Sequence, residues 1–173
     1  MNIIPTKKAL PLFSCFENSR IKACDNNAEQ LFYSWHANYF VFNRKKILVL
    51  VNDLTLSPIV LADNNAKNKK ELETYIKLGI EKVFSYSEVP LVKIKKYFLK
   101  AGRIELSSNY NRSIISINNN MIQLIKCSVE EIDFSTILQP EIMKFLAKVP
   151  FKSQSPNFSF STEVVKRELN KLI

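Results

Sequence analysis

The stretch SWHANYFVFNRKKILVLVND, residues 34–53, decides the fold that we predict for this chain. Two runs of β-branched and aromatic residues, Ser34–Phe42 and Lys46–Asp53, flank the polar segment 43–45, which is the pattern of a β-hairpin. Both faces of each run are largely apolar, so we expect the two strands to lie in the interior of a sheet.

Outward from the hairpin, shorter apolar runs predict additional strands. Asn2–Pro5 is a candidate edge strand, and Ile104–Leu106 is a candidate short strand. Leu56–Leu61 is a third candidate. Pro58 restricts this third strand to an edge or a bulge, because proline lacks the N–H group that a central strand needs.

Helical periodicity and helix-boundary residues account for most of the remaining sequence. Ser87, Asn111 and Ser161 are candidate N-caps, because their side-chain oxygens can accept the first free backbone N–H groups of a helix. Gly102 is a stop signal for the helix before it. The expected helices cover residues 7–16, 65–83, 87–101, 111–125, 140–148 and 161–169, and residues 17–29 are expected to form a polar loop.

The pattern as a whole predicts an α+β fold, with a small antiparallel sheet around the central hairpin and about five helices packed with it. We expect a single domain over residues 1–173, because the length suits one domain and no internal repeat or boundary is visible.

The apolar face of the helix at 111–125 comprises Ile114, Ile117, Met121, Leu124 and Ile125, whereas Asn118, Asn119 and Asn120 lie largely off it.

Composition excludes several classes of site. Gly79 and Gly102 are the only glycines, so the chain has neither a glycine-rich phosphate loop nor a dinucleotide-binding fingerprint. Cys15, Cys24 and Cys127 follow no paired spacing, which favours a reduced, cytoplasmic protein. With a single His and three distant Cys, we predict no metal site and no cofactor. No run approaches the roughly 20 apolar residues of a membrane span, so no membrane partner is expected.

A net charge of +9 favours polyanionic or acidic partners. The expected helix at 87–101 carries a lysine stripe that suits a nucleic-acid backbone or an acidic protein surface, although most such stripes are simply the solvated face of a helix. The hairpin tip offers a second cluster that suits phosphate contacts, against the alternative of a solvated turn. The stripe comprises Lys93, Lys96 and Lys100, and the tip comprises Arg44, Lys45 and Lys46.

The hairpin also carries the residues that most resemble a catalytic pair. A turn centred on Arg44 and Lys45 places His36 opposite Asp53, with Asn38 on the same face. An imidazole oriented by a carboxylate is the usual arrangement of a general base, but a polar pair that closes a strand end is the simpler alternative. A turn of odd length would instead place Asn52 or Leu54 opposite His36.

Arg112 is a further candidate. If Asn111 is an N-cap, Arg112 lies in the first helical turn, where the helix dipole disfavours a cation. We therefore expect Arg112 to have a partner, which is either a buried carboxylate, a backbone carbonyl or a bound anion.

Three short stretches carry a resemblance to a known family. They are Trp35-His36-Ala37-Asn38, Val51-Asn52-Asp53 and Asn111-Arg112-Ser113. On these stretches the chain resembles an uncharacterised family of small bacterial proteins, a domain of unknown function, over most of its length. The resemblance implies a shared fold and an association with mobile-element or plasmid genes, and it supplies no activity or catalytic residues.

Three functions are compatible with these observations. The first is a binding or regulatory module that engages nucleic acid or an acidic protein. The second is a hydrolase or nuclease-like enzyme that uses His36, Asp53, Asn38 and Arg112. The third is a non-catalytic inhibitor or antitoxin-like protein. The binding module ranks first because no complete active site is recognisable, and the sequence decides neither the partner nor the oligomeric state.

Overall fold

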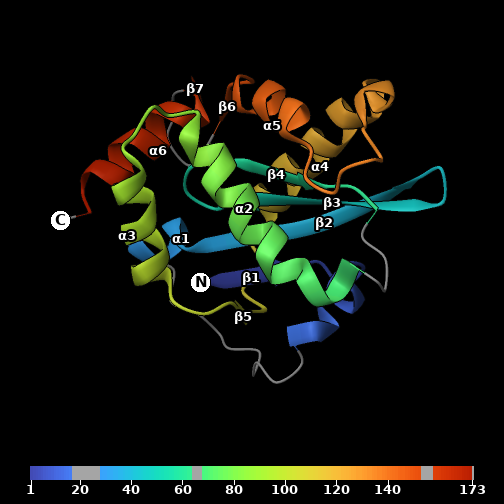
Figure 1. Cartoon of the computed structure of the whole chain (residues 1–173), viewed down its shortest axis with the longest axis horizontal. Helices are drawn as coiled ribbons and strands as arrows, with labels where there is room; N and C mark the ends of the chain where they lie inside the picture. The colour runs from blue at the N-terminus through green and yellow to red at the C-terminus, as the bar shows by residue number, and fades with distance from the viewer. Residues whose placement is uncertain (17–27, 64–67, 153–157, 173) are drawn as a thin grey trace.

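The computed structural model describes residues 1–16, 28–63, 68–152 and 158–172. Its centre is a five-stranded sheet in the order β4-β3-β2-β1-β5 (Figure 1). The β2–β3 and β3–β4 pairs are antiparallel, whereas β1 runs parallel to both of its neighbours. The strands are β1 (Asn2–Pro5), β2 (Ser34–Phe42), β3 (Lys45–Asn52), β4 (Pro58–Leu61) and β5 (Glu105–Leu106).

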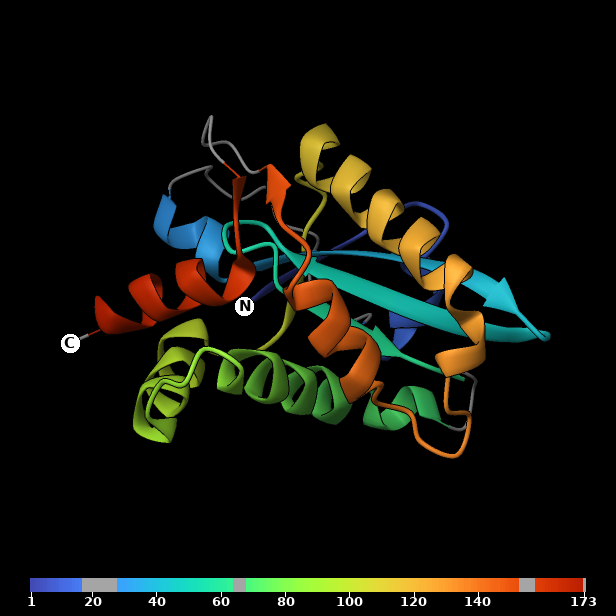
Figure 2. The same ribbon diagram turned by 90° about the horizontal axis from the view of Figure 1, so that it is seen from above.

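Helices cover both faces of this sheet, as seen from above in Figure 2. One face packs against α4, which contacts β2 and β3, while α2 and α5 pack on β4. The α-helices are α1 (Ala28–Phe32), α2 (Leu72–Ser85), α3 (Leu91–Ala101), α4 (Arg112–Cys127), α5 (Pro140–Ala147) and α6 (Ser161–Asn170). The short elements are the 3-10 helices η1 (Leu10–Phe16), η2 (Asn68–Glu71) and η3 (Val129–Glu131) and the paired strands β6 (Phe151–Lys152) and β7 (Phe158–Ser159).

The structure confirms an α+β fold, but its sheet is mixed rather than wholly antiparallel. The predicted edge strand β1 lies inside the sheet, between β2 and β5. Ile3 and Ile4 point to opposite faces and are both buried, which is the environment of an internal parallel strand. The predicted edge position of β4 is correct. None of the helices that the structure describes is long and apolar enough to cross a lipid bilayer.

The hairpin forms as predicted, but its pairing is shifted. The turn consists of Asn43 and Arg44, whose φ angles of 48° and 62° are those of a tight two-residue hairpin turn. Phe42 therefore pairs with Lys45, and His36 lies opposite Val51 instead of Asp53. The change is two residues along the partner strand, so every side chain keeps its predicted face.

Two of the predicted N-caps are wrong. Helix α3 begins only at Leu91, because Pro90 keeps the residue before it out of the helical conformation, and Ser87 lies in the preceding turn. Ser161 is inside the first turn of α6, where its hydroxyl donates to the Ala147 carbonyl. Asn111 caps α4 as predicted, and its side chain accepts from the backbone of Ser113 and Ile114.

Other boundaries also differ from the predicted ones. The expected helix at 7–16 is a 3-10 helix from Leu10, and Gly102, with φ of 65°, ends α3 as predicted. The end of the predicted loop 17–29 begins the short helix α1. The rest of that loop, with Cys24, and the start of the helix predicted from residue 65 lie outside the described residues.

Helix α2 approaches β4 closely at Gly79. A Cβ atom at this position would lie 2.5 Å from Cγ2 of Ile59, which is a severe overlap. We expect Gly79→Ala to lower the free energy of unfolding by about 1–3 kcal/mol through overpacking, despite the roughly 1 kcal/mol helical advantage of alanine. Urea denaturation measures the change. Glu81→Ala on the exposed side of α2 is the control, and a Gly79→Ala protein as stable as this control would contradict the close packing.

Candidate functional site

The predicted contact between His36 and Asp53 exists, although the register that suggested it is wrong. The Nδ1 atom of His36 lies 2.6 Å from Oδ1 of Asp53. Asp53 follows the end of β3, and its backbone N–H donates to the Ser34 carbonyl, which holds it beside β2. Its side chain then reaches His36 diagonally rather than directly across the strand pair. Both side chains are buried, and His36 is only 1% exposed.

The second nitrogen of His36 is also occupied. The backbone N–H of Asn111, at the start of α4, donates to Nε2 over 3.0 Å. A nitrogen that accepts this bond carries no proton, so His36 has its proton on Nδ1 and donates it to Asp53. A general base needs a free lone pair within reach of a substrate. The geometry therefore favours a structural clamp between β2, β3 and α4 over a catalytic pair.

The carboxyl group of Asp53 has an altered protonation equilibrium. Burial raises its pKa above the ordinary value, and the hydrogen bond from His36 opposes this shift without cancelling it. Ionisation of Asp53 therefore costs more free energy in the folded protein than in the unfolded chain.

Asn118 is a member of this polar group that sequence reasoning missed. It is 1% exposed, and its Nδ2 atom donates to the carbonyls of His36 and Val49, so it fastens the middle of α4 to the sheet. The expectation that Asn118 lies off the apolar face of its helix is thus wrong. The sequence spacing could have predicted this position, because Asn118 follows Ile114 by four residues and precedes Met121 by three, and residues at these spacings lie on the same face of a helix.

Asn38 shares the face of His36 but has other partners. Its amide donates to the Asn119 side chain on α4, and its oxygen accepts from the Thr6 hydroxyl and the Tyr39 backbone. Asn38 therefore joins the chain after β1 to α4.

Arg112 is exposed in the first turn of α4, so the buried ion pair that the sequence suggested does not form. Among the described residues, no side chain makes a hydrogen bond or ion pair with it. His36 and Asp53 are buried, whereas Arg112 faces solvent, and none of these residues lines the described pockets beside α3 and α6.

The two lysines at the hairpin tip have partners within the protein. Lys45 forms an ion pair with Asp63 at 3.2 Å and lies over the ring of Phe134. Lys46 lies over the ring of Tyr39. Arg44 occupies the turn and is exposed.

The predicted lysine stripe lies on α3, and the structure adds apolar side chains to it. Lys93 donates to Asn170 on α6, whereas Lys96 and Lys100 are exposed. We use the term α3 face for five exposed residues, three of which are large and aliphatic with exposures of 50%, 59% and 82%. The α3 face comprises Leu91 (50% exposed), Val92 (59%) and Leu99 (82%), together with the exposed Lys95 and Lys96.

The bond between His36 and Asp53 can be tested by two substitutions at one position. Asp53→Asn keeps an oxygen acceptor for the Nδ1 proton, whereas Asp53→Ala leaves that buried donor unpaired. We expect Asp53→Ala to be less stable than Asp53→Asn by about 1–3 kcal/mol in urea denaturation. Equal stabilities would show that the hydrogen bond contributes nothing.

The same asparagine variant provides a test of the buried charge. Burial raises the pKa of Asp53, so the folded state holds the proton more tightly than the unfolded state. The stability of the natural protein relative to Asp53→Asn should be highest below the unfolded pKa, about 4, and should fall as the pH rises through the folded pKa. Denaturation curves at a series of pH values measure this difference, and a rise over the same range would contradict the assignment.

Comparison with known proteins bears on the family and not on the activity. No curated protein and no solved structure matches the chain significantly. Residues 3–163 match the model of a family described as a domain of unknown function, DUF6933. The match spans nearly the whole chain and confirms the prediction of an uncharacterised family, a domain of unknown function. The chain therefore belongs to the DUF6933 family.

Proposed function

We propose that this protein is a binding module whose α3 face docks an acidic, amphipathic segment of a partner protein. The observation that carries the proposal is the exposure of Leu91, Val92 and Leu99 beside lysines on one helix. Val92 and Leu99 are seven residues apart, with Lys95 and Lys96 between them, so these side chains form one stripe along the helix.

The charge of α3 specifies the kind of partner. Its sequence, LVKIKKYFLKA, contains four lysines and no acidic residue. Exposed apolar groups that are rimmed by charge mark interaction surfaces, and a complementary partner places acidic side chains against the lysines. Aliphatic side chains in the same segment would cover Val92 and Leu99.

The apolar side chains favour a protein over a nucleic acid as the partner. Proteins bind single-stranded nucleic acids by stacking bases on aromatic rings and placing cations near phosphates. The large exposed side chains of the α3 face are aliphatic, whereas Tyr97 of the same helix is buried. An inhibitor or antitoxin-like protein would use such a surface in the same way. The hydrolase hypothesis has less support, since both nitrogens of His36 are occupied.

Site-specific photo-crosslinking tests the proposal. A photoreactive phenylalanine analogue replaces Val92 in the full chain, in cells of the organism that encodes it, and mass spectrometry identifies the adducts. We expect adducts with a protein segment rich in Asp, Glu and aliphatic residues, formed in the cytoplasm that the cysteine pattern predicts. The same analogue at Leu78, an exposed position on α2, should not form these adducts.

Charge reversal distinguishes binding through the α3 face from non-specific attraction by the overall charge of the protein. We expect Lys95→Glu with Lys96→Glu to reduce the adducts at Val92 by at least about tenfold. The control is Lys46→Glu with Lys126→Glu, which changes the net charge equally at the hairpin tip and on α4, and it should leave the adducts unchanged. Adducts with nucleic acid, or adducts that survive the α3 reversal, would overturn the proposal.

A further inference from the structure

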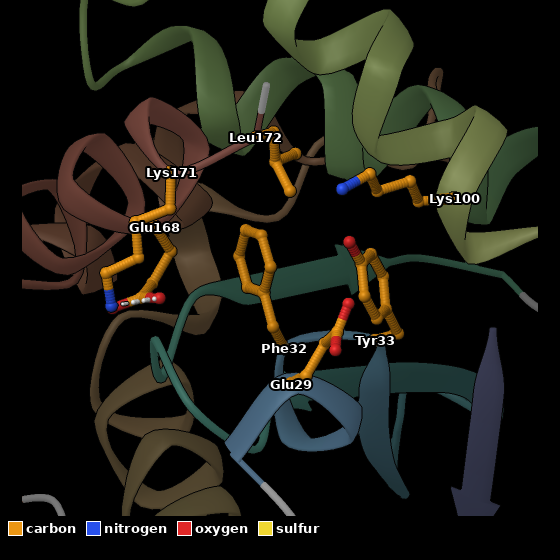
Figure 3. Close-up of a pocket in the computed structure, with 7 residues that line it drawn as sticks. All are labelled: Glu29, Phe32, Tyr33, Lys100, Glu168, Lys171 and Leu172. Carbon is orange, nitrogen blue, oxygen red and sulfur yellow. Dashed lines mark hydrogen bonds and ion pairs between the residues drawn. The ribbon is translucent and has the colours of Figure 1, made fainter.

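We infer that a pocket between α1, α3 and α6 binds a free α-amino acid with an apolar side chain. The pocket has a volume of about 270 Å³, near the lower end of the range for small-molecule sites. Its lining offers an unpartnered cation, an unpartnered carboxylate and an apolar surface within the described residues. The residues that line it are Glu29, Phe32, Tyr33, Lys100, Glu168, Lys171 and Leu172 (Figure 3).

One side of the pocket suits a carboxylate. The hydroxyl oxygen of Tyr33 is buried and has no hydrogen-bond partner among the described residues, an arrangement that costs about 1–3 kcal/mol. Figure 3 shows the ammonium group of Lys100 directed to the same side of the pocket as this hydroxyl. A ligand carboxylate there accepts a hydrogen bond from Tyr33 and pairs with Lys100.

Glu29 suits the ammonium group of the same ligand. Its carboxylate lies beside Tyr33 in Figure 3, and no described cation forms an ion pair with it. Glu168 differs from Glu29, because it is held by Lys171 and Arg167 at 2.8 and 3.0 Å. Among the described residues, Lys100 and Glu29 are therefore the two charged groups of the pocket without an ion-pair partner, and they have opposite signs.

The apolar part of the lining suits the side chain of the ligand. Phe32 lies between the Glu168–Lys171 pair and the polar group around Tyr33, with Leu172 opposite it in Figure 3. A molecule with a carboxylate, an ammonium group and an aliphatic or aromatic side chain satisfies all three parts of the lining. The small volume restricts it to the size of a single amino acid.

Calorimetric titration of the full chain with L-leucine and L-phenylalanine tests the site. We expect saturable binding of at least one of them below about 10 mM. Phenylacetate lacks the ammonium group and phenethylamine lacks the carboxylate, so each should bind at least about tenfold more weakly than L-phenylalanine. Equal binding of phenylacetate and L-phenylalanine would show a site for anions alone, and the absence of saturable binding of both L-leucine and L-phenylalanine would overturn the inference.

Three substitutions locate the binding in this pocket. Lys100→Ala, Tyr33→Phe and Glu29→Gln should each weaken binding by at least about threefold, and Tyr33→Phe keeps the aromatic packing of the ring. Lys95→Ala is the matched control on the same helix and should leave the affinity unchanged. Unchanged binding in Lys100→Ala and Glu29→Gln would overturn the inference. The reversal at Lys95 and Lys96 should also leave amino-acid binding intact, which separates this site from the α3 face.

Discussion

A buried imidazole must satisfy both of its nitrogens inside the protein, and the described structure depends on how His36 does so. Asp53 accepts from one nitrogen, and the backbone of Asn111 donates to the other. These two bonds fix the chain after β3 and the first turn of α4 against β2. Asn118, nearly two turns further along α4, makes a second polar connection between this helix and the sheet, because its amide donates to two carbonyls of the sheet. The position of α4 is thus set by polar bonds as well as by the packing of its isoleucines.

The opposite face of the sheet is organised around aromatic packing. Trp35 donates from its indole to the Tyr97 hydroxyl, which in turn donates to the Phe32 carbonyl. Because Tyr97 must point into this cluster, the rotation of α3 about its axis is fixed. That rotation turns Leu99 out to solvent and directs Lys100 toward the pocket beside α1. Both proposed binding sites therefore follow from the burial of one tyrosine.

Sequence patterns within short segments predicted most helices and strands, whereas the pairing of strands that are far apart in the chain was not predicted. The hairpin, the Asn111 cap and the Gly102 stop each rest on residues close together in sequence. The parallel insertion of β1 depends on Glu105 and Ser34, which are far from it in the chain. The turn position was missed because Arg44 adopts a positive φ without the glycine that usually marks such a turn.

For the candidate site, the sequence predicted which residues meet but not what they do. The even change of register kept His36 and Asp53 on one face, so their contact survived an error in the pairing. The hydrogen bond from the Asn111 backbone N–H to His36 determines the role of the pair, and no pattern of residue types predicts such a backbone contact. A catalytic group must be free to exchange protons with a substrate, and this imidazole is bonded at both nitrogens. The Tyr33 hydroxyl, which has no hydrogen-bond partner among the described residues, lies instead beside α1 and α3, and this is one reason why we propose binding rather than catalysis.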